Sequence, residues 1–98
     1  MQLERSESTC RIKVTDDPIF REFNFSRIIL DRLIETDKHV ILDLTMVTSL
    51  HSPGLANLVS IHVSLQKRGK TLELVGINDT NRRLLRATNL DRLLKIAE

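Results

Sequence analysis

The sequence predicts an α/β protein in which helices pack on a largely parallel or mixed β-sheet. Three short segments with strand character alternate with three segments of helical character along the 98 residues. This β, α, β, α, β, α order is typical of such a layered fold. The length and the 41% of hydrophobic residues suit one hydrophobic core, so we expect a single domain spanning residues 1–98.

The first predicted strand covers residues 9–14, where apolar and polar side chains alternate. Asp16, Asp17 and Pro18 end this strand and mark the entry to a helix. Apolar residues follow helical spacing only loosely after this point. We therefore expect the well-formed part of the helix at Ser26–Thr36.

The second strand is predicted at residues 39–44, a run of mostly β-branched and apolar residues. Such a run is typical of a strand that is buried on both faces of a sheet. A third strand, again with alternating character, is expected at residues 71–76. Asn78 or Asp79 then caps a short helix, and residues 90–94 form a last turn.

The longest helix is expected from Pro53 to about Arg68. Ser52 is a good N-cap residue, because its hydroxyl can accept a hydrogen bond from a free backbone N–H group of the first turn. Pro53 suits the first helical position, where its missing N–H group costs nothing. Gly69 is placed to end the helix.

This helix is apolar nearly all round, which normally indicates burial on more than one side. We expect one apolar stripe made of Leu55, Leu58, Val59, His62 and Leu65. One side of the helix packs on the sheet. The other side is either covered by short loops or left as an exposed patch that docks a partner.

Residues suited to catalysis or metal binding form no recognised arrangement. Ser52 and His51 are neighbours at a helix start, where two side chains rarely face each other productively. His39, His62 and the single cysteine, Cys10, lack the spacing of a metal site. The three glycines are too far apart for a phosphate-binding loop. We therefore expect no enzymatic activity, no metal and no cofactor.

Positive charge gathers in the last third of the chain. Residues 66–98 carry eight Lys and Arg against four Asp and Glu, although the net charge of the whole chain is only +2. We interpret this excess as a solvated helix face with Arg82, Arg83 and Arg86, because nucleic-acid binding would bring a stronger excess and a recognised motif. No apolar run approaches the roughly 20 residues of a membrane-spanning helix, and the lone cysteine suits a reducing compartment. We expect a cytoplasmic protein without nucleic-acid binding or direct membrane insertion.

A phosphate on Ser52 would act as a switch at this position. A helix N-terminus tolerates an anion, while roughly −1.5 to −2 added charges beside an apolar docking helix would oppose binding. The alternative is that Ser52 is only a cap.

Four blocks of the sequence, in their order and spacing, resemble a STAS domain, the fold of bacterial anti-sigma factor antagonists. They are the hydrophobic strand with its Asp-Leu ending, the segment that opens the long helix, the strand that follows a glycine, and an Arg- and Leu-rich segment: residues 40–47, 50–55, 69–76 and 81–85. The resemblance runs from about Thr9 to Ala97. It implies a mixed sheet of about four strands with helices packed on it.

The resemblance implies a regulator that works by partner switching. Ser52 matches the serine that a partner kinase phosphorylates in this family. The unphosphorylated antagonist binds an anti-sigma factor or GHKL-type serine kinase and releases its client; phosphorylation ends the binding, and a PP2C-type phosphatase resets the system. The implied docking surface consists of His51, Ser52, Pro53, Gly54, Leu55, Leu58, Val59 and His62. His51 and Pro53 stand where the family usually has an acidic residue and a second Ser or Thr.

A second hypothesis is a constitutive subunit of a membrane complex. The chain is also similar to the small STAS partner of the bacterial phospholipid-transport ABC system, which carries a segment like Ile77-Asn78-Asp79. There the corresponding helix grips an ATPase and no phosphorylation is required. That subunit tends to have a threonine at the position of Ser52, which favours the partner-switching hypothesis here.

Overall fold

The computed structural model describes residues 1–15, 22 and 24–97. Its elements run along the chain as strands β1 (Gln2–Ser6) and β2 (Thr9–Lys13), helix α2 (Phe25–Arg32), strand β3 (His39–Asp43), helix α3 (His51–Lys67), strand β4 (Thr71–Val75), helix α4 (Asp79–Ala87), the short 3-10 helix η1 (Leu90–Arg92) and strand β5 (Lys95–Ile96). The predicted entry at Asp16, Asp17 and Pro18 lies outside the described residues.

The five strands form one mixed sheet in the order β1-β2-β3-β4-β5. Strand β1 pairs with β2 antiparallel, and every later neighbour is parallel. The three strands predicted from the sequence are confirmed as β2, β3 and β4. The sheet has five strands instead of about four, because a hairpin strand precedes β2 and two residues near the C-terminus pair with β4.

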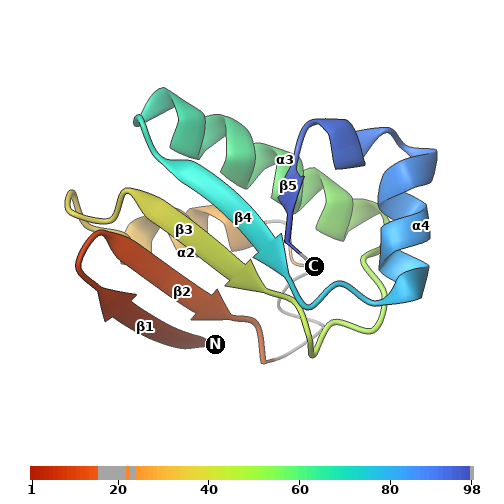
Figure 1. Ribbon diagram of the computed structural model, residues 1–98, viewed down its shortest axis with the longest axis horizontal. Helices are drawn as coiled ribbons and strands as arrows, with labels where there is room; N and C mark the ends of the chain where they lie inside the picture. Colours follow the sequence, from red (N-terminus) through yellow and green to blue (C-terminus); the bar gives the residue numbers. More distant parts are fainter. Residues whose placement is uncertain (16–21, 23, 98) are drawn as a thin grey trace.

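Helices α2 and α3 cover one face of the sheet, and α4 lies beside the carboxyl ends of strands β3 and β4 (Figure 1). Side chains that point to the helices are fully buried, as Ile12, Val40, Leu42 and Leu74 show. The prediction that residues 39–44 are buried on both faces is wrong. His39 is exposed and Ile41 only half-buried, because an apolar run has the same composition whether helices cover one face of its sheet or both.

Helix α2 is shorter than the expected Ser26–Thr36, because the chain turns away after Arg32 and is extended at Leu33. The carbonyl oxygens of Ile34, Glu35 and Asp37 accept hydrogen bonds from the buried ammonium of Lys70. The carboxylate of Asp37 in turn accepts from the Ile34 N–H at 2.9 Å. At this polar corner, a helix that reached Thr36 would bond the Ile34 N–H internally but would leave the carbonyls of Ile34 and Glu35 without a donor, because the last four carbonyls of a helix have none within it.

The long helix α3 turns a different stripe to the sheet than predicted. Its buried residues are Gly54, Asn57, Leu58, Ile61 and Leu65, spaced by three and four as one helical face requires. Leu58 and Leu65 were placed correctly, whereas Leu55, Val59 and His62 are only half-buried. When a helix is apolar on most sides, its sequence does not indicate which side faces the sheet. The rotation of the helix is then decided by packing.

The C-terminal end of α3 and the N-terminal end of α4 follow the expected chemistry. Gly69 has φ +72° and directly follows the C-cap Arg68 of α3, which confirms its role in ending that helix. Asn78 is confirmed as the N-cap of α4, because its side chain accepts a hydrogen bond from the Asn81 N–H at 2.8 Å.

Candidate functional site

Ser52 lies in the first turn of α3, at the end of the connection from β3. It is exposed, and its hydroxyl makes no hydrogen bond to any residue that the structure describes. The prediction that Ser52 caps the helix is wrong: the N-cap is Leu50, no side chain caps it, and Ser52 is the second helical residue. The hydroxyl is therefore not used in holding the helix.

Pro53 is the third residue of α3 instead of the first. The first four backbone N–H groups of a helix have no acceptor within it, so the missing N–H of proline is tolerated here as well. The helix begins earlier than predicted because His51 is its first residue, although the φ of His51 is +54°. This left-handed conformation is uncommon outside glycine and fixes how the chain enters α3.

Two asparagines of the α4 start hold the connection that leads to Ser52. The buried side chain of Asn81 accepts from the Leu50 N–H at 2.9 Å and donates to the Val47 carbonyl at 3.0 Å. The amide of Asn78 donates to the Thr48 carbonyl at 3.0 Å. Sequence reasoning missed this role of Asn81. The signal was an asparagine inside an amphipathic helix, where it is a weak helix former.

The other end of the connection is fixed where β3 ends. The Asp43 carboxylate accepts hydrogen bonds from the Thr45 N–H at 2.9 Å and from the Thr45 hydroxyl at 2.5 Å, and it pairs with the Arg11 guanidinium at 3.1 Å. Burial raises the pKa of Asp43, but the hydrogen bonds from Thr45 and Arg11 outweigh it and hold this pKa below its usual range. Gly76 packs directly against this turn.

The predicted docking residues divide by exposure. His51, Ser52 and Pro53 are exposed; Leu55, Val59 and His62 are half-buried; Gly54 and Leu58 are buried. Leu58 has no exposed surface at all, so it supports the helix from the core side and does not reach a docking partner directly.

Ser52 heads an outward-facing row of small and apolar side chains on α3. Ala56 and Val63 are exposed and Val59 is half-buried. The spacing of four, three and four residues places them on one side of the helix. We call Ser52, Ala56, Val59 and Val63 the outer ridge of α3. Ala56 and Val63 were not among the predicted docking residues, because the predicted stripe ran along a different side.

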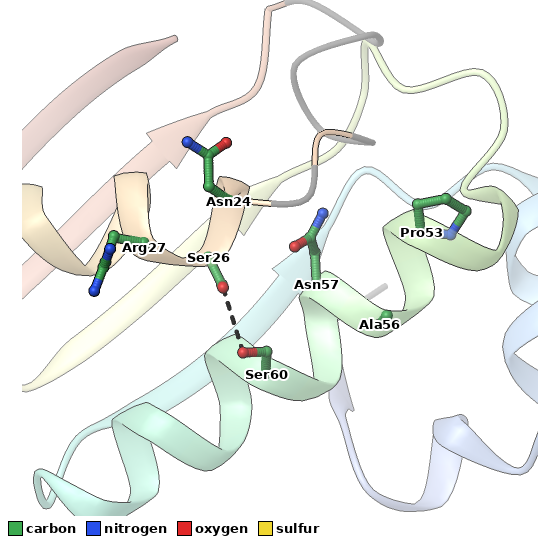
Figure 2. A pocket seen from close by; sticks show the side chains of 7 residues that line it. All are labelled: Asn24, Ser26, Arg27, Pro53, Ala56, Asn57 and Ser60. Carbon is green, nitrogen blue, oxygen red and sulfur yellow. Dashed lines mark hydrogen bonds between the residues drawn. The ribbon is translucent and has the colours of Figure 1, made fainter.

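A hollow flanks each side of the start of α3. One, of about 430 Å³, lies between α2 and α3 and is lined by Asn24, Ser26, Arg27, Pro53, Ala56, Asn57 and Ser60 (Figure 2). The hydroxyls of Ser26 and Ser60 meet across it at 3.3 Å. The other, of about 510 Å³, lies between the start of α3 and α4. The start of the outer ridge, at Ser52, thus lies between two hollows.

The described residues hold no group of three or more His, Cys, Asp or Glu that could bind a metal ion. Within the same residues, no helix is long and apolar enough to cross a bilayer. Cys10 is buried in β2, and burial raises the pKa of its thiol.

Two solved structures have the same architecture. The NMR structure of the protein TM1081 aligns with a TM-score of 0.83 at 26% identity, covering 98% of this chain and 78% of that chain. A crystal structure of tm1081 from Thermotoga maritima, described as a candidate anti-sigma factor antagonist, aligns with a TM-score of 0.73 at 23% identity, covering 99% of this chain and 85% of that chain. The STAS domain model matches residues 1–98. The chain therefore belongs to the STAS domain family.

Proposed function

We propose that the protein is an anti-sigma factor antagonist that switches partners through phosphorylation of Ser52. The unphosphorylated form binds an anti-sigma factor with serine kinase activity and releases its client. The kinase then phosphorylates Ser52, and a PP2C-type phosphatase restores the binding form. Membership of the STAS family and the description of the similar Thermotoga maritima protein support the anti-sigma factor as partner.

The observation that carries this proposal is the exposed, unbonded hydroxyl of Ser52 at the head of the outer ridge. A kinase can reach a hydroxyl that is solvent-exposed and bonded to none of the described residues. The N-terminal turn of a helix also favours a negative group, typically by 0.3–1 kcal/mol at an exposed site. Phosphorylation therefore leaves the fold intact.

The same phosphate opposes docking. A partner that packs on Ala56, Val59 and Val63 has to remove water from the Ser52 side chain, because Ser52 lies on the same side of α3. A phosphoserine carries about −1.5 to −2 charges at neutral pH, and their desolvation is costly. The modification thus changes the binding surface without a change of backbone structure.

The test combines intact mass with binding of designed variants. We expect the protein from its own cells to contain a form heavier by one phosphate, mapped to Ser52 and absent in Ser52→Ala. Ser52→Asp should weaken binding to purified anti-sigma factors of the source organism at least tenfold, while Ser52→Ala binds like wild type. Ser60→Asp is the matched control, because Ser60 is an exposed serine of the same helix that faces the α2 side.

Equal affinities for Ser52→Asp, Ser60→Asp and wild type would contradict the switch. Absence of the phosphorylated form under every growth condition, together with stable binding to an ABC ATPase, would favour the constitutive-subunit hypothesis. The expectation that the protein is not an enzyme stays a prediction, and kinase or phosphatase activity of the purified chain alone would overturn it.

A further inference from the structure

The groove between the start of α3 and α4 is lined by both apolar and polar side chains. It has a volume of about 510 Å³ and is lined by Ser49, His51, Thr80, Arg83, Leu84 and Ala87. We call it the α3–α4 groove. Leu84 and Ala87 supply apolar surface, while the hydroxyls of Ser49 and Thr80 can donate hydrogen bonds. The size suits one or two inserted side chains.

Arg83 is the full positive charge among these lining residues. It is exposed, and the ion pairs within the described residues use other arginines, Arg5 with Asp37 and Arg11 with Asp43. Asp79 lies one helical turn before Arg83 on α4 and forms no ion pair with it in the described structure. The guanidinium of Arg83 is therefore available for a carboxylate from outside the chain.

The surroundings of the groove are positive as well. Arg86 follows Arg83 by three residues on α4 and is exposed, and Arg82 adjoins it. Asp79 is the one acidic residue of this helix. Charge complementarity therefore selects an acidic occupant. The apolar lining residues Leu84 and Ala87 add a second requirement, namely a methylene stem beside the charge, as in glutamate or aspartate.

We propose that the α3–α4 groove receives an acidic side chain of the anti-sigma factor, whose carboxylate pairs with Arg83 while its stem packs on Leu84 and Ala87. This inference rests on the proposed function and names a contact by which the partner is recognised. A protein is favoured over a nucleic acid or a lipid surface, because the groove combines one guanidinium with apolar lining residues instead of a long basic track.

The groove also explains why phosphorylation would act so strongly here. His51 lines the groove, and Ser52 is the next residue. A phosphate on Ser52 places negative charge beside the site that receives the partner's carboxylate. Two like charges repel in a partly desolvated interface, where screening by water and salt is weak. The positive groove thus makes an acidic partner sensitive to the modification.

The experiment measures the affinity of wild type, Arg83→Glu, Arg83→Gln and Arg68→Glu for each purified anti-sigma factor of the source organism, by calorimetry at 50 and 300 mM salt. Arg68 is the control, since it is an exposed arginine at the opposite end of α3. We expect Arg83→Glu to weaken binding at least tenfold, Arg83→Gln to weaken it less, and Arg68→Glu to leave it within twofold. A Lys in place of one acidic residue of the partner should restore binding to Arg83→Glu.

Equal affinities of Arg83→Glu and Arg68→Glu overturn the groove assignment and leave the proposed function standing, because wild type still binds. If no anti-sigma factor binds wild type, the proposed function fails and this inference fails with it. Urea unfolding of each variant separates a binding loss from a folding loss. A defect of Arg83→Glu confined to a DNA duplex or to anionic vesicles would also overturn the assignment.

Discussion

Replacement of Gly76 by alanine tests how closely the β4–α4 connection packs against the end of β3. Gly76 has φ +72°, and a Cβ atom built on it would lie 2.9 Å from the Thr45 backbone nitrogen and 3.0 Å from the Asp43 carboxylate. Gly69 has the same φ of +72°, but a Cβ atom there would meet nothing within 4 Å. The two glycines therefore form a matched pair that differs in packing and not in backbone conformation.

The expected loss for Gly69→Ala is about 1 kcal/mol. A left-handed conformation costs an L-residue about 1–2 kcal/mol, and the reduced freedom of the unfolded chain returns about 0.4–1 kcal/mol. Gly76→Ala carries the same cost and adds overpacking, which typically amounts to about 1–3 kcal/mol. The backbone of Thr45 cannot move freely, because its N–H and its hydroxyl are both bonded to Asp43.

Urea unfolding followed by far-UV circular dichroism gives the free energy of unfolding for wild type and both variants. We expect Gly76→Ala to be less stable than Gly69→Ala by about 1–3 kcal/mol, with a melting temperature lower by about 4–8 °C for each kcal/mol. The Thr45 hydroxyl oxygen lies nearest to this Cβ position, so Thr45→Ala should relieve part of the Gly76→Ala loss, while the contact with the Thr45 backbone nitrogen remains. Equal losses at the two glycines would refute the claimed close approach.

Two further predictions concern α3 and the polar corner behind α2. Leu58→Ala should lower the free energy of unfolding by about 2–5 kcal/mol, because Leu58 is fully buried. Val59 is half-buried, so Val59→Ala should lower it by less than about 1 kcal/mol but should weaken partner binding. A binding loss for Val59→Ala that follows only from unfolding would contradict this prediction. The hydrogen-bonded pair with Arg5 lowers the pKa of Asp37 against the opposing effect of burial. The ionised carboxylate therefore stabilises the fold at pH values above the ordinary Asp pKa, and this stabilisation is lost as the pH falls through the lowered pKa. Urea midpoints from pH 7 to pH 2 should therefore fall more steeply for wild type than for Asp37→Asn, and parallel curves would count against the pair.

The fold could be predicted because its signals are local and repeated. Alternation of apolar residues in β2 and β4, the Asn78 cap and Gly69 after α3 each use short-range chemistry, and they agree with one another. Strand β1 was missed, because the segment Gln2–Ser6 is largely exposed and its pattern carries little apolar signal. Its pairing with β2 depends on the hairpin and not on its own composition.

That Ser52 lies at the start of the long helix could be predicted from sequence, but the rotation of this helix could not. The position of Ser52 at the start of a helix follows from the resemblance and from Pro53 and Gly54 beside it. The predicted N-cap was wrong by two positions, because His51, in a left-handed conformation, starts the helix earlier than the usual cap chemistry indicates. The hydrogen bond from the Leu50 N–H to the Asn81 side chain joins residues about 30 positions apart in the sequence, and no local pattern predicts such a contact.

The structure separates the group proposed to change charge from the groups that hold its segment in place. Asn81 bonds the chain at Val47 and Leu50, and Asn78 bonds it at Thr48, so the connection is fixed without any bond to the Ser52 hydroxyl. At a residue that also served as the helix cap, a change to alanine would cost about 1 kcal/mol of stability. Because no side chain caps α3, Ser52→Ala removes the proposed phosphorylation site without removing a helix cap. Ser52 does not cap α3, so we expect Ser52→Ala to keep a stability close to that of wild type. Any altered response of this variant to the kinase then reports on phosphorylation and not on folding.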